Sequence, residues 1–490
     1  MMMKKRMCLL LCTNILLLAQ ESTMKDCVFR EYDIRGIVNE EFSLDMTYQL
    51  GKAIAYFLKM KDPSLKTIAI GMDGRTHSPL IKDEITRACI ESGINVIFIG
   101  VCTTPVLYFA LYSLPIDGGL MITASHNPKE YNGIKLCLGK SSVWGLQVQE
   151  IKQLFKEKKE LSSGDYGVLT TYALIPEYVD WLVDHFSHLK GMTLSAVIDC
   201  GNGAAGTVLP LLIQKMAWDQ VSLLYEEVDG NYPNHEANPT EIANMLEVQK
   251  RVQTTPVDVG IGLDGDCDRM APMTKSGFLV PGDQLLALFS QQILKKHPGA
   301  SIVCEVKSSQ GLIDLLHKWQ ARVCISPTGH AIIKDQMRKH GALLGGELSC
   351  HFFFKDDYFG YDDGIYAMMR LFDLLVNSKK TLDELLTIFP KKISTPEYFI
   401  ACPDDRKQSI MANIKDAFIQ DGDAQLITID GVRATYTDGW GIVRASNTTP
   451  KLTLRFESDT QEGLQNIKRR FIEKLHPYFA EEIIKKAIQW

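Results

Sequence analysis

Short apolar runs of strand length alternate with amphipathic stretches of helix length through the first three-quarters of the chain. The stretch at residues 43–60 has the spacing of an amphipathic helix and opens on Ser43, which we expect to cap it. This alternation is typical of α/β units built on parallel or mixed sheets, and it predicts an α/β fold. The apolar runs are residues 67–71, 95–100, 195–200, 257–263 and 301–306.

The pattern changes after about Pro390, where short strand-like runs dominate and are followed by a single predicted helix at residues 460–475. This tail predicts a smaller α+β domain at the C-terminal end of the chain. At 490 residues the chain is too long for one hydrophobic core. We place domain boundaries near residues 170, 277 and 390, which divides the chain into segments 24–170, 171–277, 278–390 and 391–490.

The first 23 residues look different from the rest. Lys4, Lys5 and Arg6 precede an apolar stretch at residues 7–19, a pattern that is typical of a signal peptide. The stretch is short for a membrane span. Because Met24 follows directly, we interpret residues 1–23 as an upstream start-site artefact and expect a cytoplasmic protein, with a secreted enzyme or a secreted interaction protein as the alternatives.

Composition excludes several classes of protein. The twelve cysteines include no C-x-x-C pair and several lie inside apolar runs, which favours a reducing compartment over a disulfide framework or a zinc site. A net charge of −6 argues against a nucleic-acid partner, yet a few arginines in one cleft can still bind an anionic substrate.

A polar loop, Thr123-Ala124-Ser125-His126-Asn127-Pro128, follows the apolar strand that ends at Ile122. A strand end exposes a hydroxyl on a rigid support, which suits a nucleophile. We expect His126 to point away from Ser125, as neighbours on a strand do, and no G-x-S-x-G elbow surrounds the serine. A serine that carries phosphate therefore fits better than a Ser-His hydrolase.

Three aspartates, Asp264, Asp266 and Asp268, alternate directly after another apolar run. Carboxylates at this spacing on one loop can converge on a hard divalent cation such as Mg²⁺. An EF-hand loop is excluded, because Arg269 stands where that loop needs glycine and Lys275 stands where it needs glutamate. Arg269 then lies where it can pair with a phosphate that shares the metal.

Two further loops carry the chemistry of sugar-phosphate binding. Arg444, Ser446, Asn447 and Thr448 combine a guanidinium, hydroxyls and an amide, which suits a phosphate dianion. Glu347 and Ser349 lie two residues apart and so share a face of an extended segment, where they can bind adjacent sugar hydroxyls. Lys307 and His330 also follow strand-like runs and can enter the same cleft, while for Asp362 and Asp363 we favour a structural role.

Together these motifs closely resemble those of the α-D-phosphohexomutases, in particular the bacterial phosphomannomutase/phosphoglucomutase branch. The resemblance extends from Phe29 to about Thr460 and rests on the loops above and four further motifs. These are residues 29–36 (FREYDIRG), 131–135 (YNGIK), 199–203 (DCGNG) and 228–231 (VDGN).

The resemblance implies four domains around a central cleft, three of them related α/β domains with mixed sheets. The four segments would be, in order, a phosphoserine, a metal-binding, a sugar-binding and a phosphate-binding domain. The reaction would interconvert hexose 1-phosphate and hexose 6-phosphate through a hexose 1,6-bisphosphate, with Mg²⁺ as cofactor. We expect a monomer or weak dimer with no membrane or nucleic-acid partner.

The resemblance also implies a role for each site residue. Ser125 would be the phosphoserine and would join the three aspartates in holding Mg²⁺. The sugar loop would supply Glu347, Ser349 and His351, and the phosphate loop would supply Arg444, Ser446, Asn447 and Thr448. Proton transfer would fall to Lys135 and His330, with Tyr32, Arg35, Arg269 and Lys307 lining the cleft.

One residue departs from the family pattern. Cys350 stands where this branch usually has glycine, and we expect its side chain to strain the loop or to shift His351. The sugar preference therefore stays open between mannose and glucose phosphates. The alternatives are a phosphoglucosamine mutase and a non-catalytic sugar-phosphate binder.

Overall fold

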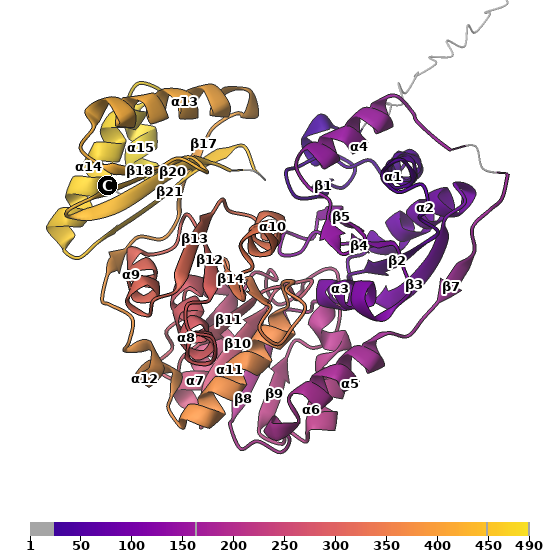
Figure 1. Ribbon diagram of the computed structural model, residues 1–490, viewed down its shortest axis with the longest axis horizontal. Coiled ribbons are helices and arrows are strands. Elements are labelled where there is room, and N and C mark those ends of the chain that lie inside the picture. The colour runs from indigo at the N-terminus through magenta and orange to yellow at the C-terminus, as the bar shows by residue number, and fades with distance from the viewer. Residues whose placement is uncertain (1–23, 162–163, 447–448, 489–490) are drawn as a thin grey trace, which may run out of the picture.

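The computed structural model describes residues 24–161, 164–446 and 449–488. Four sheets follow one another along the chain, and each carries its own helices (Figure 1). Three of the sheets are mixed and the last is antiparallel throughout. The protein therefore has three mixed α/β domains followed by an antiparallel α+β domain, as predicted.

The first domain is built on a seven-stranded sheet in which β4, β2, β3 and β7 run parallel, while β5 pairs antiparallel with β4 and β1. Its strands are β1 (Ile34–Ile37), β2 (Thr67–Met72), β3 (Asn95–Val101), β4 (Gly118–Ile122), β5 (Tyr131–Leu138), β6 (Ser141–Ser142) and β7 (Leu169–Thr171). Its helices are η1 (Asp26–Val28), α1 (Thr47–Lys61), α2 (Ser78–Glu91), α3 (Thr104–Ser113) and α4 (Leu146–Lys156).

The second and third domains share one arrangement, in which three parallel strands are followed by an antiparallel edge strand. The second comprises α5 (Ile175–His185), η2 (Ser187–Leu189), β8 (Ala196–Asp199), η3 (Ala204–Thr207), α6 (Leu209–Met216), β9 (Val221–Leu224), η4 (Ile242–Met245), α7 (Leu246–Thr254), β10 (Val259–Leu263) and β11 (Met270–Met273). The third comprises α8 (Gly282–Lys296), β12 (Ser301–Glu305), α9 (Gln310–Lys318), β13 (Arg322–Ser326), α10 (His330–His340), β14 (Leu344–Gly346), β15 (Phe352–Phe354), α11 (Gly364–Ser378) and α12 (Leu382–Leu386).

The C-terminal domain packs three helices on its antiparallel sheet. It comprises β16 (Ile393–Ser394), β17 (Tyr398–Ala401), α13 (Asp404–Asp421), β18 (Gln425–Ile427), β19 (Val432–Tyr436), β20 (Gly439–Ala445), β21 (Lys451–Ser458), α14 (Gln461–Leu475) and α15 (Glu481–Ala487). Helix α13 was not predicted from the sequence, because most of its surface faces solvent and its apolar spacing is weak.

Two local predictions can be compared with the observed helix ends. Helix α1 begins at Thr47, and Ser43 does not cap it, because residues 43–46 form a separate turn in which Ser43 O accepts from Met46 N. That prediction was wrong. The predicted helix at residues 460–475 is α14, and the Thr460 side chain caps it by accepting from Gly463 N.

Buried apolar side chains explain how the domains hold together. The largest cluster runs without interruption from α3 of the first domain through the second and third domains. The C-terminal domain has a separate core, which includes Ile414, Leu454 and Phe471. It contacts the third domain through buried polar groups, such as Arg433, which donates to the backbone oxygens of Val306 and Ser308. A small apolar cluster of Val306, Trp440 and Ile442 also crosses this boundary.

The ten cysteines within the described residues are all free. No helix in the described part of the chain is long and apolar enough to cross a bilayer.

Candidate active site

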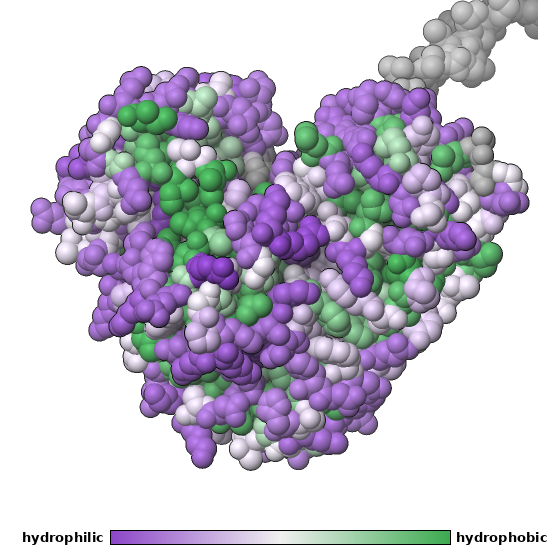
Figure 2. Space-filling view, in the orientation of Figure 1, coloured by the Kyte–Doolittle hydropathy of each residue, from purple (hydrophilic) through white to green (hydrophobic). Residues whose placement is uncertain are grey.

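A cavity of about 870 Å³ lies where the four domains meet. In the space-filling view the surface is notched between the C-terminal domain and the first domain (Figure 2). Most of the residues predicted from the sequence line this one cavity: Tyr32, Arg35, Ser125, Lys135, Arg269, Lys307, His330, Glu347, Ser349, His351, Arg444 and Ser446. Asp268 also lines it, and Asn447 and Thr448 lie outside the described residues.

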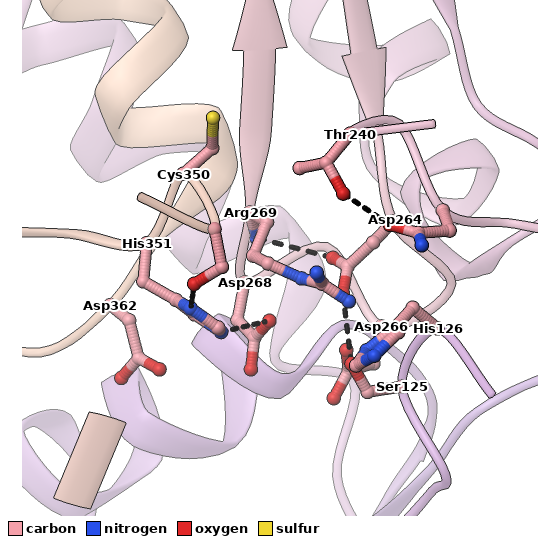
Figure 3. Close-up of polar contacts among 12 residues, drawn as sticks. Ser125, His126, Thr240, Asp264, Asp266, Asp268, Arg269, Cys350, His351 and Asp362 are labelled. Atoms are coloured by element: carbon pink, nitrogen blue, oxygen red, sulfur yellow. Dashed lines mark hydrogen bonds and ion pairs between the residues drawn. The ribbon is translucent and has the colours of Figure 1, made fainter. Parts of the chain in front are cut away.

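Ser125 follows the end of β4 in a left-handed turn, with a φ of 51°. The Thr123 hydroxyl accepts from Ser125 N at 2.8 Å, which helps hold the turn. The Ser125 hydroxyl donates to Asp264 Oδ2 at 2.9 Å, so the loops of the first and second domains meet at this side chain (Figure 3). Ser125 is 3% exposed, and its hydroxyl is therefore both buried and directed at the acidic loop.

The prediction that His126 points away from Ser125 was wrong. His126 Nδ1 lies 3.1 Å from Ser125 Oγ, because the left-handed turn removes the strand alternation on which the prediction relied. Burial, together with Arg269 and Arg35, holds the pKa of His126 well below its usual range. Its ring is therefore neutral at pH 7.

Arg75 is a residue that the sequence analysis missed. Its fully buried guanidinium donates to Ser125 O at 2.8 Å, Asn127 O at 2.5 Å, Pro128 O at 2.7 Å and Tyr131 O at 3.1 Å. The serine loop is thus wrapped around one side chain. Arg75 follows the end of β2, and its polar character at a strand end was a signal that could have identified it.

Arg35 holds the same loop from β1. Its guanidinium donates to Ala124 O at 3.1 Å and to Asn127 Oδ1 at 2.7 Å. Gly265 closes the loop from the opposite side, since a Cβ there would lie only 2.6 Å from Ser125 O. The serine position therefore depends on contacts from two domains.

The three aspartates converge as predicted. Asp264, Asp266 and Asp268 each offer a carboxylate oxygen, and these oxygens lie within 4.8 Å of one another. All three residues are at most 1% exposed. Lys135 bridges two of them, with Nζ at 2.6 Å from Asp266 Oδ2 and 2.5 Å from Asp268 Oδ2.

The donor set of this acidic loop fits a hard divalent cation. Three carboxylates are the ligands that Mg²⁺ prefers, and Asp266 Oδ1 is buried with no hydrogen-bond partner in the described structure. Burial beside Asp268 raises the pKa of the Asp264 carboxyl, despite the opposing effect of Arg269. A cation held by these oxygens would offset the repulsion between the carboxylates.

Arg269 and Lys135 place positive charge beside the serine. Arg269 Nε donates to Asp264 Oδ2 at 2.9 Å, the same oxygen that accepts from Ser125. Burial opposes the charge on Lys135, but Asp266 and Asp268 outweigh it and raise the pKa of Lys135. Lys135 is therefore a cation at neutral pH.

The predicted sugar loop lies between β14 and β15 and joins the acidic loop through His351. The His351 ring lies 3.2 Å from Asp268 Oδ1 through Nε2 and 3.2 Å from Glu347 Oε2 through Nδ1. Glu347 Oε1 also accepts from Gly329 N at 2.7 Å. Burial disfavours the imidazolium, but Asp268 and Glu347 raise the pKa of His351 to about 10.

Cys350 occupies a left-handed position, with a φ of 68°, as expected for a position that suits glycine. Its side chain is buried and directed away from His351 (Figure 3). The sulfur lies 3.8 Å from Leu348 O. His351 keeps its contacts to Asp268 and Glu347, so the cysteine is accommodated within the loop.

His330 begins α10 and faces the same cavity. Its Nδ1 lies 3.5 Å from Asp362 Oδ2, and its ring stacks at 6.0 Å from that of His351. Burial and the nearby Lys334 ammonium lower the pKa of His330, with Asp362 opposing them. Asp363, in contrast, caps α11 by accepting from Tyr366 N, which agrees with the predicted structural role.

Lys307 joins the third and C-terminal domains. Its Nζ lies 3.0 Å from Glu397 Oε1 and 3.6 Å from Glu305 Oε2. Glu305 also accepts from Leu348 N at 2.5 Å and from the Thr328 hydroxyl at 2.7 Å, so this buried carboxylate positions two loops of the cavity. Glu305, the last residue of the apolar strand β12, was not predicted from the sequence.

The predicted phosphate loop is braced by two residues that were also missed. Asp430 accepts from Arg444 Nε and from Thr328 N, each at 3.0 Å, and so couples the loop to the third domain. Lys407 on α13 donates to Ser446 O at 2.7 Å and to Thr449 O at 3.0 Å. Tyr32 reaches the same region, where its hydroxyl donates to Thr328 O.

Comparisons with known proteins agree with this architecture. The four sequence models of the phosphoglucomutase/phosphomannomutase family match in order: α/β/α domain I at residues 26–162, domain II at 176–277, domain III at 281–392 and the C-terminal domain at 399–474.

Similar proteins cover nearly the whole chain. A phosphomannomutase/phosphoglucomutase of Pseudomonas syringae pv. tomato is 40% identical over 92% of this chain and 96% of its own length. A phosphoglucomutase of Neisseria gonorrhoeae is 37% identical over 91% and 95%. The crystal structure of a phosphoglucomutase/phosphomannomutase family protein from Burkholderia thailandensis aligns with a TM-score of 0.84 at 30% identity, covering 93% of this chain and 98% of that one. The chain therefore belongs to the phosphoglucomutase/phosphomannomutase family.

Proposed function

We propose that this protein is a phosphohexomutase that interconverts the 1-phosphate and 6-phosphate of mannose, glucose or both through a phosphoserine at Ser125. The observation that carries the proposal is the buried Ser125 hydroxyl, which contacts the acidic loop at 2.9 Å inside the cavity that Glu347 and Arg444 also line. The relatives named above are phosphomannomutases and phosphoglucomutases, which supports the same reaction class.

The serine carries out both halves of the reaction. In the first half the bond between the phosphorus and Ser125 Oγ breaks, and the free hydroxyl of the hexose phosphate bonds to the phosphorus and loses its proton. The resulting bisphosphate turns over. Ser125 Oγ then bonds to the phosphorus of its other phosphoryl group, the bond from that phosphorus to the sugar oxygen breaks, and the sugar oxygen takes up a proton. Transfer of this kind depends on positioning and charge stabilisation, which Arg269 and Lys135 provide beside the serine.

His330 is suited to accept the proton of the sugar hydroxyl. Its lowered pKa keeps the ring neutral at pH 7, so that one nitrogen can act as a base. Lys135 is suited to the complementary role, because it is a buried ammonium that can donate a hydrogen bond to the phosphoryl group. Both line the central cavity.

The sugar and the distant phosphate are bound by separate loops. Glu347 and Ser349 bind two adjacent sugar hydroxyls near the midline of the turnover, so one pair serves both orientations. Arg444 and Ser446, with Asn447 and Thr448, bind the phosphate that does not react. Because the C-terminal domain has a core of its own, it can move to let the bisphosphate turn.

A magnesium ion belongs to this proposal. Asp264, Asp266, Asp268 and the Ser125 phosphate would hold it, and it would neutralise charge that develops on the transferred group. We also propose that the four functional segments divide near residues 170, 277 and 390, as predicted from the sequence.

The test is turnover of mannose 1-phosphate, glucose 1-phosphate and glucosamine 1-phosphate with a catalytic amount of the matching bisphosphate. We expect comparable kcat/KM for the first two and little for the third. A clear preference for glucosamine 1-phosphate would make the protein a phosphoglucosamine mutase with the same mechanism. No turnover of any of them would favour a non-catalytic sugar-phosphate binder.

Two variants test the mechanism. Ser125→Ala should abolish multiple turnover without added bisphosphate, whereas Ser113→Ala, which alters an exposed serine on α3, should leave it unchanged. Near-normal activity of Ser125→Ala would refute the phosphoserine. Asp266→Asn should weaken Mg²⁺ binding in a calorimetric titration, and an unchanged affinity would show that the metal assignment is wrong.

A further inference from the structure

A second cavity, of about 510 Å³, lies between the first and third domains. Helix α3 and strands β5 and β6 form one wall, and α10 with the loop after β15 forms the other. Direct contacts cross it: Arg338 donates to the Ser141 hydroxyl, and the Tyr112 and Phe359 rings lie 4.6 Å apart between centroids. The volume falls in the range of small-molecule pockets.

The polar lining of this cavity is positively charged. Lys140, Lys334, Arg338 and Lys355 line it, and none of the described residues that line it is an aspartate or glutamate. Arg338 is paired with Asp335 on its own helix at 3.5 Å. Within the described structure, Lys140 and Lys355 form no ion pair at all. Their charges therefore remain available to an anion.

The inner lining is apolar and aromatic. Leu111 and Ala342 are buried there, and the Lys140 ammonium lies 4.4 Å from the centre of the Tyr112 ring. A cationic rim over an aromatic floor complements a ligand with an anionic group attached to an apolar ring. A sugar phosphate lacks the apolar body that this floor would cover.

One of the four cations connects the cavity to the active site. Lys334 Nζ lies 4.2 Å from the centre of the Tyr108 ring on the cavity side and 2.9 Å from Asp362 Oδ1 on the other. Asp362 Oδ2 in turn lies 3.5 Å from His330 Nδ1. An anion that attracts Lys334 therefore weakens its pairing with Asp362 and changes the electrostatic field at His330.

We propose that this cavity is a second ligand site, for a small anion with an aromatic body, and that its occupant modulates the active site through Lys334 and Asp362. The binding part stands independently of the proposed function. The modulation rests on the proposed function, because it is measured as a change in mutase turnover.

Binding is tested on the full chain with 8-anilinonaphthalene-1-sulfonate, an aromatic anion whose fluorescence rises on burial. We expect saturable binding that glucose 6-phosphate does not displace. The double variant Lys140→Ala/Arg338→Ala should raise Kd about tenfold or more, since two charge-assisted contacts are lost. The matched control Lys61→Ala/Arg87→Ala removes one lysine and one arginine on α1 and α2, neither of which lines this cavity, and should leave Kd unchanged.

Two binding results would overturn the site: displacement by glucose 6-phosphate, or equal Kd for the two double variants. To test the modulation, saturating probe should change kcat for glucose 1-phosphate by about fivefold or more in the wild type. The same probe concentration should leave the kcat of Lys140→Ala/Arg338→Ala unchanged. An unchanged kcat with the probe bound would overturn the link to His330. Absence of turnover of both mannose 1-phosphate and glucose 1-phosphate without any probe would instead refute the proposed function, and the fluorescence titration would still decide the site.

Discussion

The buried guanidinium of Arg75 should control both the stability of the first domain and the position of Ser125. Arg75→Met keeps the length of the side chain but removes every donor, so four backbone oxygens lose their charged partner. It also leaves the fully buried Asp73 carboxylate without its ion pair, which was held at 3.2 Å. Breaking a buried pair of this kind costs about 3–5 kcal/mol, and a hydrogen bond to a charged group contributes roughly 1.5–3 kcal/mol.

Because these contributions overlap in one side chain, we expect Arg75→Met to lower the free energy of unfolding by about 5 kcal/mol. Arg75→Lys keeps the charge beside Asp73 but cannot reach all four oxygens, and should cost roughly half as much. A serine displaced by about 1 Å should lower kcat about 100-fold in either variant.

The assays are urea unfolding followed by circular dichroism and steady-state turnover of glucose 1-phosphate. The control is Arg87→Met, on α2 of the same domain, where the side chain is 52% exposed and pairs with Glu84 on the surface. This control should change stability by less than about 0.5 kcal/mol. If Arg75→Met behaves like Arg87→Met in both assays, the reasoning about the serine loop is refuted.

Three further changes test other parts of the structure. Lys407→Met should raise KM for sugar phosphates about tenfold with little change in kcat, because Lys407 holds only the backbone of the phosphate loop; a fall in kcat alone would contradict this. Cys350→Gly relieves a left-handed strain and should stabilise the protein by about 0.5 kcal/mol in urea unfolding, whereas a loss of stability would mean that the packing of the thiol matters more. Burial opposes the charge on His235, but Asp199 outweighs it and raises the pKa of His235. The pair therefore contributes its full stability below the ordinary histidine pKa of about 6.5. This contribution is lost as the pH rises through the pKa of His235 in the folded protein. The stability advantage of the wild type over His235→Gln should therefore shrink from about pH 5.5 to pH 9 in thermal unfolding, and an advantage that is independent of pH would count against the ion pair.

Local patterns were sufficient for some features of the site. The spacing of Asp264, Asp266 and Asp268 predicted that their carboxylates converge. They do so because alternate residues of one short loop stay close together in space. The same reasoning failed at His126, since the left-handed φ of Ser125 interrupts the strand pattern. It also failed at α13, whose apolar face is too weakly patterned to distinguish it from a loop.

The residues that the sequence analysis missed share a physical property. Arg75, Glu305, Asp430 and Lys407 all bind backbone groups that lie far away in the chain or on another element. A backbone oxygen or N–H carries no side-chain signature, so the acceptor or donor cannot be identified from the sequence. Such contacts are visible only after the loops have been brought together.

The sequence by itself determined the order of α/β units, the separate C-terminal domain and several of the polar residues that line the central cavity. The domain order follows from periodicity, and Ser125, Asp268 and Arg444 follow from polar loops beside strands, which are local properties of the chain. Tyr32, Arg35, Lys135 and His351 followed only from the resemblance to the family. The resemblance implied that Ser125 lies near Asp264, 139 residues away, but only the tertiary structure gave their direct contact at 2.9 Å and the second, cationic cavity between the first and third domains. Those distances depend on how four sheets and their helices pack together, and that packing is set by the sum of many buried contacts rather than by any single motif.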